Sequence, residues 1–153
     1  MKLPESVLVV IHTPALDVLL VERTDHPGFW QSITGSRNTA GEPLRTTCVR
    51  EVAEETGLIV SPDQLDDWHL SHRFRIYEDW RHRYALGVTH NTEHVFALCL
   101  PRTFAPRLDP REHLAYRWLK WHEAAEACFS WSNADAIRRL HVGAPGCQAT
   151  ARG

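Results

Sequence analysis

The sequence has few cysteines, and none of them stands in the spacing of a metal site or a disulfide framework. Cys48, Cys99, Cys128 and Cys147 lie far apart, and no two of them form a C-x-x-C pair. Structural zinc sites use such closely spaced pairs, and small secreted proteins are rich in paired cysteines. We therefore expect buried or incidental thiols in a reducing compartment, and we predict a cytoplasmic protein.

The sequence also lacks an excess of charge of one sign and a long hydrophobic run. The formal net charge is −2 with histidine neutral, and acidic and basic residues are mixed along the 153 positions. This balance argues against a polyanion-binding surface, so no nucleic-acid partner is expected. The apolar run at 7–11 is too short to cross a membrane and lacks the features of a secretory signal. No membrane partner is expected either.

The pattern along the chain predicts one domain, residues 1–141, followed by a frayed tail, residues 142–153, that is rich in glycine and alanine. Strands dominate around one central helix, which is typical of α+β or α/β proteins and does not fix the topology. The apolar and β-branched runs predict strands at 6–11, 17–21, 58–60, within 68–77, and at 94–100 and 116–119. The expected helices are 43–56, 123–128 and 134–140, the last capped by Ser132 or Asn133.

The most informative stretch is an acidic cluster in the central helix. Glu51, Glu54 and Glu55 fall within five residues. At 3.6 residues per turn, Glu51 and Glu55 lie about 40° apart around the helix. Leu44 and Cys48 point the same way, so the cluster borders the face that packs inward. Unpaired carboxylates in a partly dry place are costly, and a divalent ion with oxygen ligands, Mg²⁺ or Mn²⁺, relieves that cost.

An alternative is that this cluster is a solvated helical face, because glutamate-rich helices with an arginine four residues before a glutamate are common. The surrounding residues favour the functional interpretation. The stretch resembles the Nudix box, G-x5-E-x7-R-E-U-x-E-E-x-G-U, where U is apolar. Its defined positions are filled by Gly35, Glu42, Arg50, Glu51, Val52, Glu54, Glu55, Gly57 and Leu58.

One departure from the box lies in its loop. Six residues, not five, separate Gly35 from Glu42, whereas the pattern from Glu42 onward is intact. We expect Gly41 to absorb the additional residue in a bulge of the loop. The departure concerns the loop and leaves the helix unaffected.

The resemblance implies an α/β fold, a Nudix-type α/β/α sandwich with a mixed β-sheet, in which the box forms a loop–helix–loop catalytic motif. It also implies attack of water on a diphosphate that carries a further group. Segments outside the box must select that group. Residues 29–36, 82–89, 91–93, 112–116 and 130–133, together with the box, are similar to the dihydroneopterin triphosphate diphosphatase branch of the Nudix family.

This resemblance implies a magnesium-dependent hydrolase of folate biosynthesis that converts 7,8-dihydroneopterin 3′-triphosphate to the monophosphate and pyrophosphate. It places the metal on Glu51, Glu55 and Glu112. We expect Glu51 and Glu54 to be catalytic, with Glu54 as the first candidate for the base and Glu112 and Glu93 as weaker ones. The substrate contacts that it implies are Arg23, Thr34, Phe74, Arg75, Ile76, Tyr77 and Ser130.

The chemistry of a small-molecule triphosphate gives these residues plausible roles. Arg23 and Arg83 offer several N–H donors to phosphate oxygens, although most arginines are simply exposed. His113 is the histidine expected at the site, because it follows Glu112. A flat bicyclic base needs aromatic walls. The candidates, of which one or two should touch the ligand, are Trp30, Phe74, Tyr77, Trp80, Tyr84 and Trp131.

Two other functions stay open at this point. One is a general (d)NTP pyrophosphatase, since purines and pterins are both bicyclic and hydrogen-bond along one edge. The other is a catalytically silent Nudix module that senses a nucleotide-like ligand. The intact glutamates of the box argue against a silent module, and the irregular loop argues weakly for it. The sequence leaves the oligomeric state and the number of metal ions open.

Overall fold

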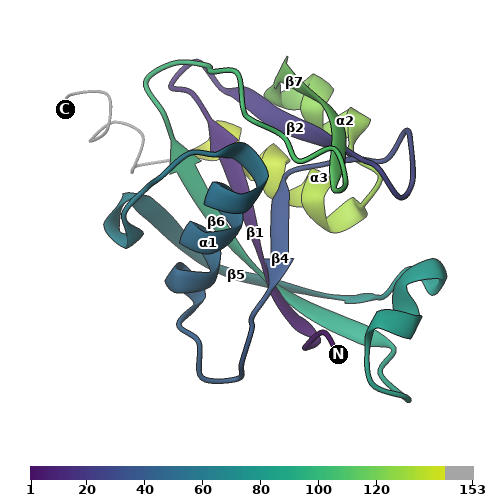
Figure 1. The fold of residues 1–153 in the computed structure, drawn as a ribbon. Coiled ribbons are helices and arrows are strands. Elements are labelled where there is room, and N and C mark those ends of the chain that lie inside the picture. Colours follow the sequence, from purple (N-terminus) through teal and green to yellow (C-terminus); the bar gives the residue numbers. More distant parts are fainter. Residues whose placement is uncertain (144–153) are drawn as a thin grey trace.

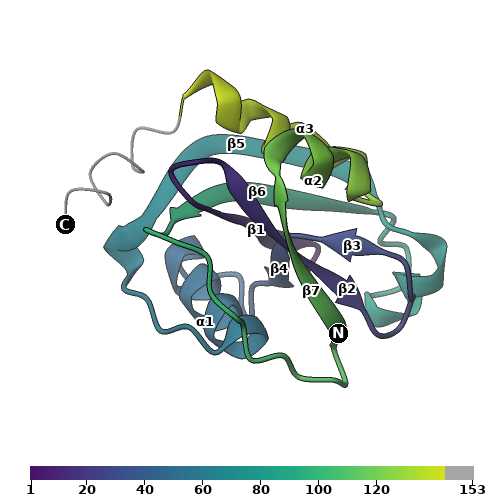
Figure 2. The same ribbon diagram turned by 90° about the horizontal axis from the view of Figure 1, so that it is seen from above.

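The computed structural model describes residues 1–143, which form two helical layers around one sheet (Figures 1 and 2). Helix α1 (Leu44–Thr56) covers one face, and helices α2 (Trp121–Ala127) and α3 (Trp131–Arg138) cover the other. The expected α/β/α sandwich is confirmed. Most of the expected tail, 142–153, lies outside the described residues.

The sheet contains seven strands: β1 (Glu5–His12), β2 (Asp17–Arg23), β3 (Trp30–Gln31), β4 (Ile33–Ser36), β5 (Leu65–Arg75), β6 (His90–Cys99) and β7 (His113–Lys120). Their order is β3-β2-β1-β6-β5, with β4 paired to β1 and β7 paired to β2. Strands β1 and β6 run parallel and the other pairs are antiparallel, so the sheet is mixed. Three short 3₁₀ turns, Pro62–Gln64, Glu78–Arg83 and Arg139–Val142, complete the described elements.

Strand β1 lies between the helical layers, and this position explains its apolar run at 7–11. Val7, Val9 and Ile11 belong to the core under α1, whereas Leu8 and Val10 belong to the core under α2 and α3. Successive side chains of a strand point to opposite faces, so a strand covered on both faces needs a continuous apolar run. The same alternation decides which side chains of β4 face which half of the site.

Most expected elements are present, and two expectations are wrong. Residues 58–60 form no strand: the backbone N–H of Leu58 donates to Thr56 Oγ1 instead of to a neighbouring strand. Helix α3 begins after Ser130, because the amide of Asn133 is bonded to Ser32 in the interior. Gly41 lies in a turn of the loop with an ordinary backbone and open space around it, so the bulge at this position stays a prediction.

The cysteines follow the expectation only in part. Cys48 and Cys128 are free thiols, whereas Cys99 is disulfide-bonded. Cys147 lies outside the described residues.

Within residues 1–143 there is no helix of the length and apolar character needed to cross a membrane.

Candidate active site

The acidic cluster lies on α1 where the helix meets the sheet. Pro43 precedes the first turn, and Gly57 ends the helix in the left-handed conformation at φ 78°. Cys48 and Val52 anchor the inner face in the core. Glu55 shares that face and is only 7% exposed, so the interpretation as a solvated face is wrong for this carboxylate.

Gly35 of β4 makes room for the Glu51 side chain. A β-carbon at position 35 would lie 2.0 Å from Glu51 Cδ and 2.3 Å from its Oε1, far inside van der Waals contact. Glu51 therefore crosses the strand where the strand has no side chain. This contact gives the first glycine of the box a steric reason in this chain.

Arg50 holds the loop of the box against the helix. Its guanidinium donates to Glu42 Oε1 at 2.8 Å, to Glu51 Oε1 at 2.7 Å and to the Ser36 carbonyl at 3.2 Å. Glu42 also accepts a hydrogen bond from Thr47 Oγ1 at 2.6 Å, and the bonds from Thr47 and Arg50 hold the pKa of Glu42 at about 2. The arginine thus joins loop, strand and helix and orients Glu51.

Among residues 1–143, Glu55 forms no ion pair with an arginine or a lysine, and Arg23 only partly offsets its charge. Burial, followed by the like charges of Glu51 and Glu112, raises its pKa well above the usual value. His113 Nε2 lies 3.3 Å from Glu55 Oε1, but burial lowers the pKa of His113 and favours the neutral imidazole. The second oxygen of Glu55 is buried and has no hydrogen-bond partner among residues 1–143.

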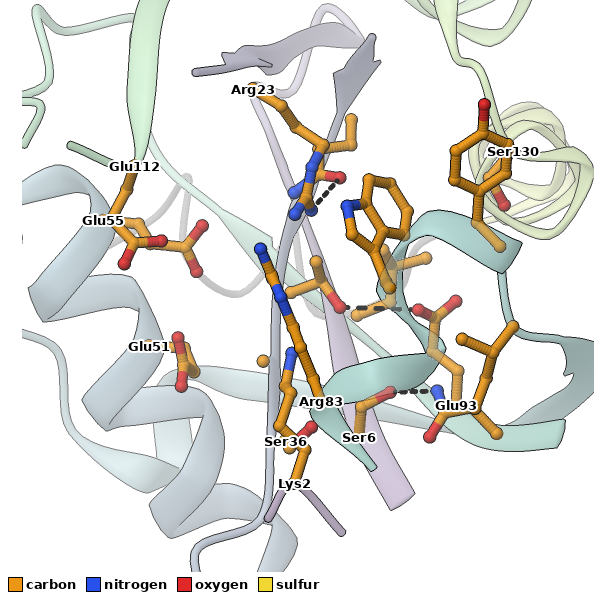
Figure 3. A pocket seen from close by; sticks show the side chains of 18 of the residues that line it. Lys2, Ser6, Arg23, Ser36, Glu51, Glu55, Arg83, Glu93, Glu112 and Ser130 are labelled. Atoms are coloured by element: carbon orange, nitrogen blue, oxygen red, sulfur yellow. Dashed lines mark hydrogen bonds between the residues drawn. The ribbon is translucent and has the colours of Figure 1, made fainter. Parts of the chain in front are cut away.

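Glu112 reaches the same space from the turn just before β7. Figure 3 shows Glu51, Glu55 and Glu112 together on one side of the cleft, although α1 and β7 are far apart in the sequence. We call these three carboxylates the acidic wall. In the described part of the chain, they do not close into a complete set of metal ligands on their own. A buried oxygen without a partner beside two like charges is nevertheless what a cation would satisfy.

A group of cations faces the acidic wall. Arg23 is bonded to Asp25 at 2.8 Å by two nitrogens, and Arg83 reaches the same carboxylate at 3.0 Å. These bonds, led by the one from Arg23, lower the pKa of Asp25 to about 2. Lys2 adds a third cation, and partial burial with repulsion from the two arginines lowers its pKa. Figure 3 shows Lys2, Arg23 and Arg83 between the acidic wall and the far end of the cleft.

The far end of the cleft is a polar floor, which we define as the buried Ser6, Asn91, Glu93 and Ser132 and the half-buried Thr34. The Asn91 side-chain nitrogen donates to Ser6 Oγ at 2.8 Å, and hydroxyls of Thr34 and Ser132 lie 3.4 Å and 3.5 Å from the Glu93 carboxylate. Glu93 and Ser6 lie on the opposite side of the cleft from Glu51 (Figure 3). Burial raises the pKa of Glu93 to about 7.

A single cleft of about 1140 Å³ joins the acidic wall, the cations and the polar floor. Every side chain predicted from the sequence for catalysis, metal binding or substrate binding lines it: Arg23, Thr34, Glu51, Glu54, Glu55, Phe74, Arg75, Ile76, Tyr77, Glu112 and Ser130. His113 lines it as well. Their roles stay predictions, whereas their common location is a feature of the fold.

Sequence reasoning missed several residues of the cleft. Lys2 precedes the first expected strand and Asp25 follows the expected strand at 17–21, so neither carried a signal. Phe129 stacks on Phe29 with ring centroids 4.5 Å apart and lines the cleft. Among the aromatic candidates, Trp30 does not line it, because its ring packs under α2 and α3 and stacks with Arg117 at 4.6 Å.

Comparison with known proteins agrees with this geometry. The family model described as the NUDIX domain matches residues 2–140. The chain is a Nudix domain. Among curated Nudix relatives, the dihydroneopterin triphosphate diphosphatase of Escherichia coli K12 is 43% identical over 146 residues, which are 94% of this chain and 95% of that protein. The Haemophilus influenzae protein of the same name is 38% identical and covers 88% of this chain and 85% of its own length.

The three-dimensional comparison gives the same result for the Nudix fold. The solved structure of the E. coli dihydroneopterin triphosphate pyrophosphohydrolase matches with a TM-score of 0.85 at 43% identity, covering 94% of this chain and 98% of that one. The protein is thus a Nudix hydrolase, and the family in general uses divalent metal ions. The acidic wall fits such an ion, because Glu55 carries a buried oxygen without a partner beside two further carboxylates.

Proposed function

We propose that this Nudix hydrolase cleaves 7,8-dihydroneopterin 3′-triphosphate into dihydroneopterin monophosphate and pyrophosphate. The observation that carries the proposal is one cleft that joins an acidic wall and three cations to a polar floor. The first part suits a triphosphate, and the second suits a polar bicyclic base. The relatives named for this activity share almost the whole length of the chain.

The cations are arranged to bind phosphate oxygens. Arg23 and Arg83 together carry two positive charges against the single charge of Asp25, and Lys2 adds another. Guanidinium groups held by a carboxylate keep their remaining N–H donors oriented, which suits the non-bridging oxygens of phosphate. We assign Arg23 to this role, with Arg83 and Lys2 beside it.

We assign metal binding to Glu51, Glu55 and Glu112, with Mg²⁺ as the ion and Mn²⁺ as a substitute, because all three offer only oxygen ligands. When bound, the metal lowers the pKa of the attacking water and neutralises charge on the phosphates. Glu54 is exposed and lines the cleft next to this trio. We assign to Glu54 the acceptance of the water's proton, a role that its position beside the trio supports.

The remaining contacts belong to the base and sugar. Thr34 and Ser130 offer hydroxyls. The segment Phe74, Arg75, Ile76 and Tyr77 spans the end of β5 and lines the cleft. We propose that these residues bind the pterin half of the substrate. The partner is thus a small-molecule triphosphate, and we propose neither a nucleic-acid nor a membrane partner. We place the reaction in the cytoplasm.

A substrate panel tests the proposal. Purified protein with Mg²⁺ should release pyrophosphate from dihydroneopterin triphosphate with a higher kcat/KM than from dATP or dGTP. Glu51→Gln, prepared alongside, should remove activity on all three and so exclude a contaminating phosphatase. Equal efficiency on the pterin and dATP would favour a general nucleotide pyrophosphatase. Absence of turnover with every substrate would favour a sensor.

A further inference from the structure

Glu93 is a buried carboxylate at the floor of the cleft, far from the acidic wall. It lies on β6 beside Ser6 of β1 and His72 of β5. The residue is 6% exposed, yet it lines the cleft that the substrate occupies. An ionised carboxylate in such a place is costly unless several donors surround it.

The two hydroxyl neighbours of Glu93 lie at long hydrogen-bond distances from it and also bond to other groups. Thr34 Oγ1 has one proton and donates it to the Val7 carbonyl at 2.9 Å, whereas its distance to Glu93 Oε2 is 3.4 Å. Ser132 Oγ lies 2.8 Å from Ser130 Oγ and 3.5 Å from Glu93 Oε1. Both carboxylate oxygens therefore retain free acceptor capacity.

No charged group in the described part of the chain compensates Glu93. Its neighbours are the hydroxyls above and the phenol of Tyr84, whose pKa it helps to raise. A metal ion would need further ligands, and the floor offers only neutral hydroxyls and the Asn91 amide. A neutral partner with two adjacent N–H donors matches both free oxygens of the carboxylate at once.

We propose that Glu93 reads the base of the substrate by accepting two hydrogen bonds from a 2-amino-4-oxo-pyrimidine edge. On that edge the exocyclic amino group and the neighbouring ring N–H are parallel donors that fit the two carboxylate oxygens. This inference rests on the proposed function and extends it, because it names the group that recognises the pterin. Glu93 is thereby a specificity-determining residue at the end opposite to the chemistry.

The same hydrogen bonds to Glu93 would distinguish the two purines. Guanine carries the same pair of donors as a pterin, whereas adenine presents a donor next to an acceptor. Ionised Glu93 should therefore accept pterin and guanine edges and disfavour adenine, whose ring nitrogen would face a carboxylate oxygen without a proton between them. A glutamine at the same position offers one acceptor and one donor, which fits adenine instead.

The experiment compares wild type and Glu93→Gln on dihydroneopterin triphosphate, dGTP and dATP at one Mg²⁺ concentration. The variant should lose about 10- to 150-fold in kcat/KM on the first two. Its activity on dATP should be retained or increased, which also shows that the variant is folded. Glu123→Gln on the exposed face of α2 is the matched control and should change none of the three.

A binding measurement separates recognition from turnover. Calorimetric titration of dihydroneopterin, which has no phosphates, without metal should show binding to wild type and to Glu123→Gln but at least about 10-fold weaker binding to Glu93→Gln. An equal loss on all three triphosphates, or an unchanged ratio between dGTP and dATP, would overturn the role of Glu93. Failure of wild type to hydrolyse the pterin would instead reject the proposed function, and the guanine–adenine comparison would still test Glu93.

Discussion

The cleft has two ends that each contain a buried carboxylate, and the surroundings of the two carboxylates differ in kind. Glu55 lies beside the like charges of Glu51 and Glu112, which add to the effect of burial on its pKa. Glu93 is approached by two hydroxyls, at 3.4 Å and 3.5 Å, that also bond to other groups. At one end several negative charges lie close together, and at the other a single carboxylate has only two long hydrogen bonds.

This difference shows that a buried carboxylate can indicate opposite kinds of ligand. Several carboxylates around one space repel each other, and a cation relieves that repulsion. A single carboxylate among neutral groups needs donors rather than charge, because two good N–H bonds stabilise its ionised form. The two ends of the cleft can be tested separately by changing one carboxylate at a time.

The largest effect is expected at the acidic wall. Glu51→Gln and Glu55→Gln should each lower kcat by about 10³-fold or more, because loss of a metal ligand removes several kcal/mol of transition-state stabilisation. Initial rates at saturating Mg²⁺ measure this, and circular dichroism checks the fold. Retention of more than about a tenth of wild-type kcat, a difference of ~1.4 kcal/mol, would contradict a ligand role.

Burial of Glu93 in the polar floor should make the free energy of unfolding depend on pH. The pKa of Glu93 is raised to about 7 in the folded protein, so folding is disfavoured once the unfolded chain ionises this group. Glu93→Gln should match wild type at pH 4 and be more stable by up to about 3 kcal/mol at pH 8, with the difference growing between pH 4.5 and 7. Urea unfolding at several pH values provides the measurement.

The control for this pH effect is Glu123→Gln, whose side chain lies on the exposed face of α2. Its unfolding free energy should stay parallel to that of wild type across the same pH range. A difference between Glu93→Gln and wild type that does not depend on pH would mean that Glu93 ionises normally in the folded protein.

The close approach of β4 and α1 predicts a loss of activity with little loss of stability. In Gly35→Ala the new methyl group would displace the flexible end of Glu51, and a misplacement of about 1 Å can cost about 10²-fold in rate. Gly41→Ala is the control, because its methyl group would meet nothing within 4 Å. The measurement compares the rates and melting temperatures of both variants. Equal rates would show that the Glu51 side chain moves aside without loss of function.

The smallest effect is expected at the distal carboxylate. Glu112→Ala should raise the Mg²⁺ concentration for half-maximal rate by about 10-fold, or ~1.4 kcal/mol, and should hardly change the melting temperature, because Glu112 is exposed. A Mg²⁺ titration of the rate measures this. An unchanged titration curve would leave Glu112 as a residue of the turn after Pro110 and would restrict the acidic wall to α1.

The acidic end was predictable because its residues are local in sequence. Glu51 and Glu55 lie on one helix, so helical periodicity alone places them together and beside the core. The same holds for β1, whose continuous apolar run predicts a strand covered on both faces. Glu112 was placed only through the resemblance to a family, since its position beside α1 depends on the tertiary structure.

The polar floor was less predictable because it is assembled from β1, β4, β6 and α3, which are distant in sequence. Glu93 was considered only as a weak candidate for the base, since nothing in its neighbourhood shows that it is buried beside engaged hydroxyls. Helix-capping propensity also gave the wrong start for α3, because a tertiary contact determines it. Asn133 has the chemistry of a helix cap, but its amide bonds Ser32 in the interior, and the helix begins earlier.

Strand β4 separates the two ends, since Thr34 approaches Glu93 and position 35 approaches Glu51. The width of this strand sets the minimum length of a ligand that can contact both ends. A ligand gains from both ends only if it is long enough to reach across the strand, and the second contact then forms at a high effective concentration. Once such a ligand is cut, the piece that leaves from the acidic end no longer reaches the floor. The leaving piece therefore binds more weakly than the intact substrate. A new substrate molecule can replace it in the cleft.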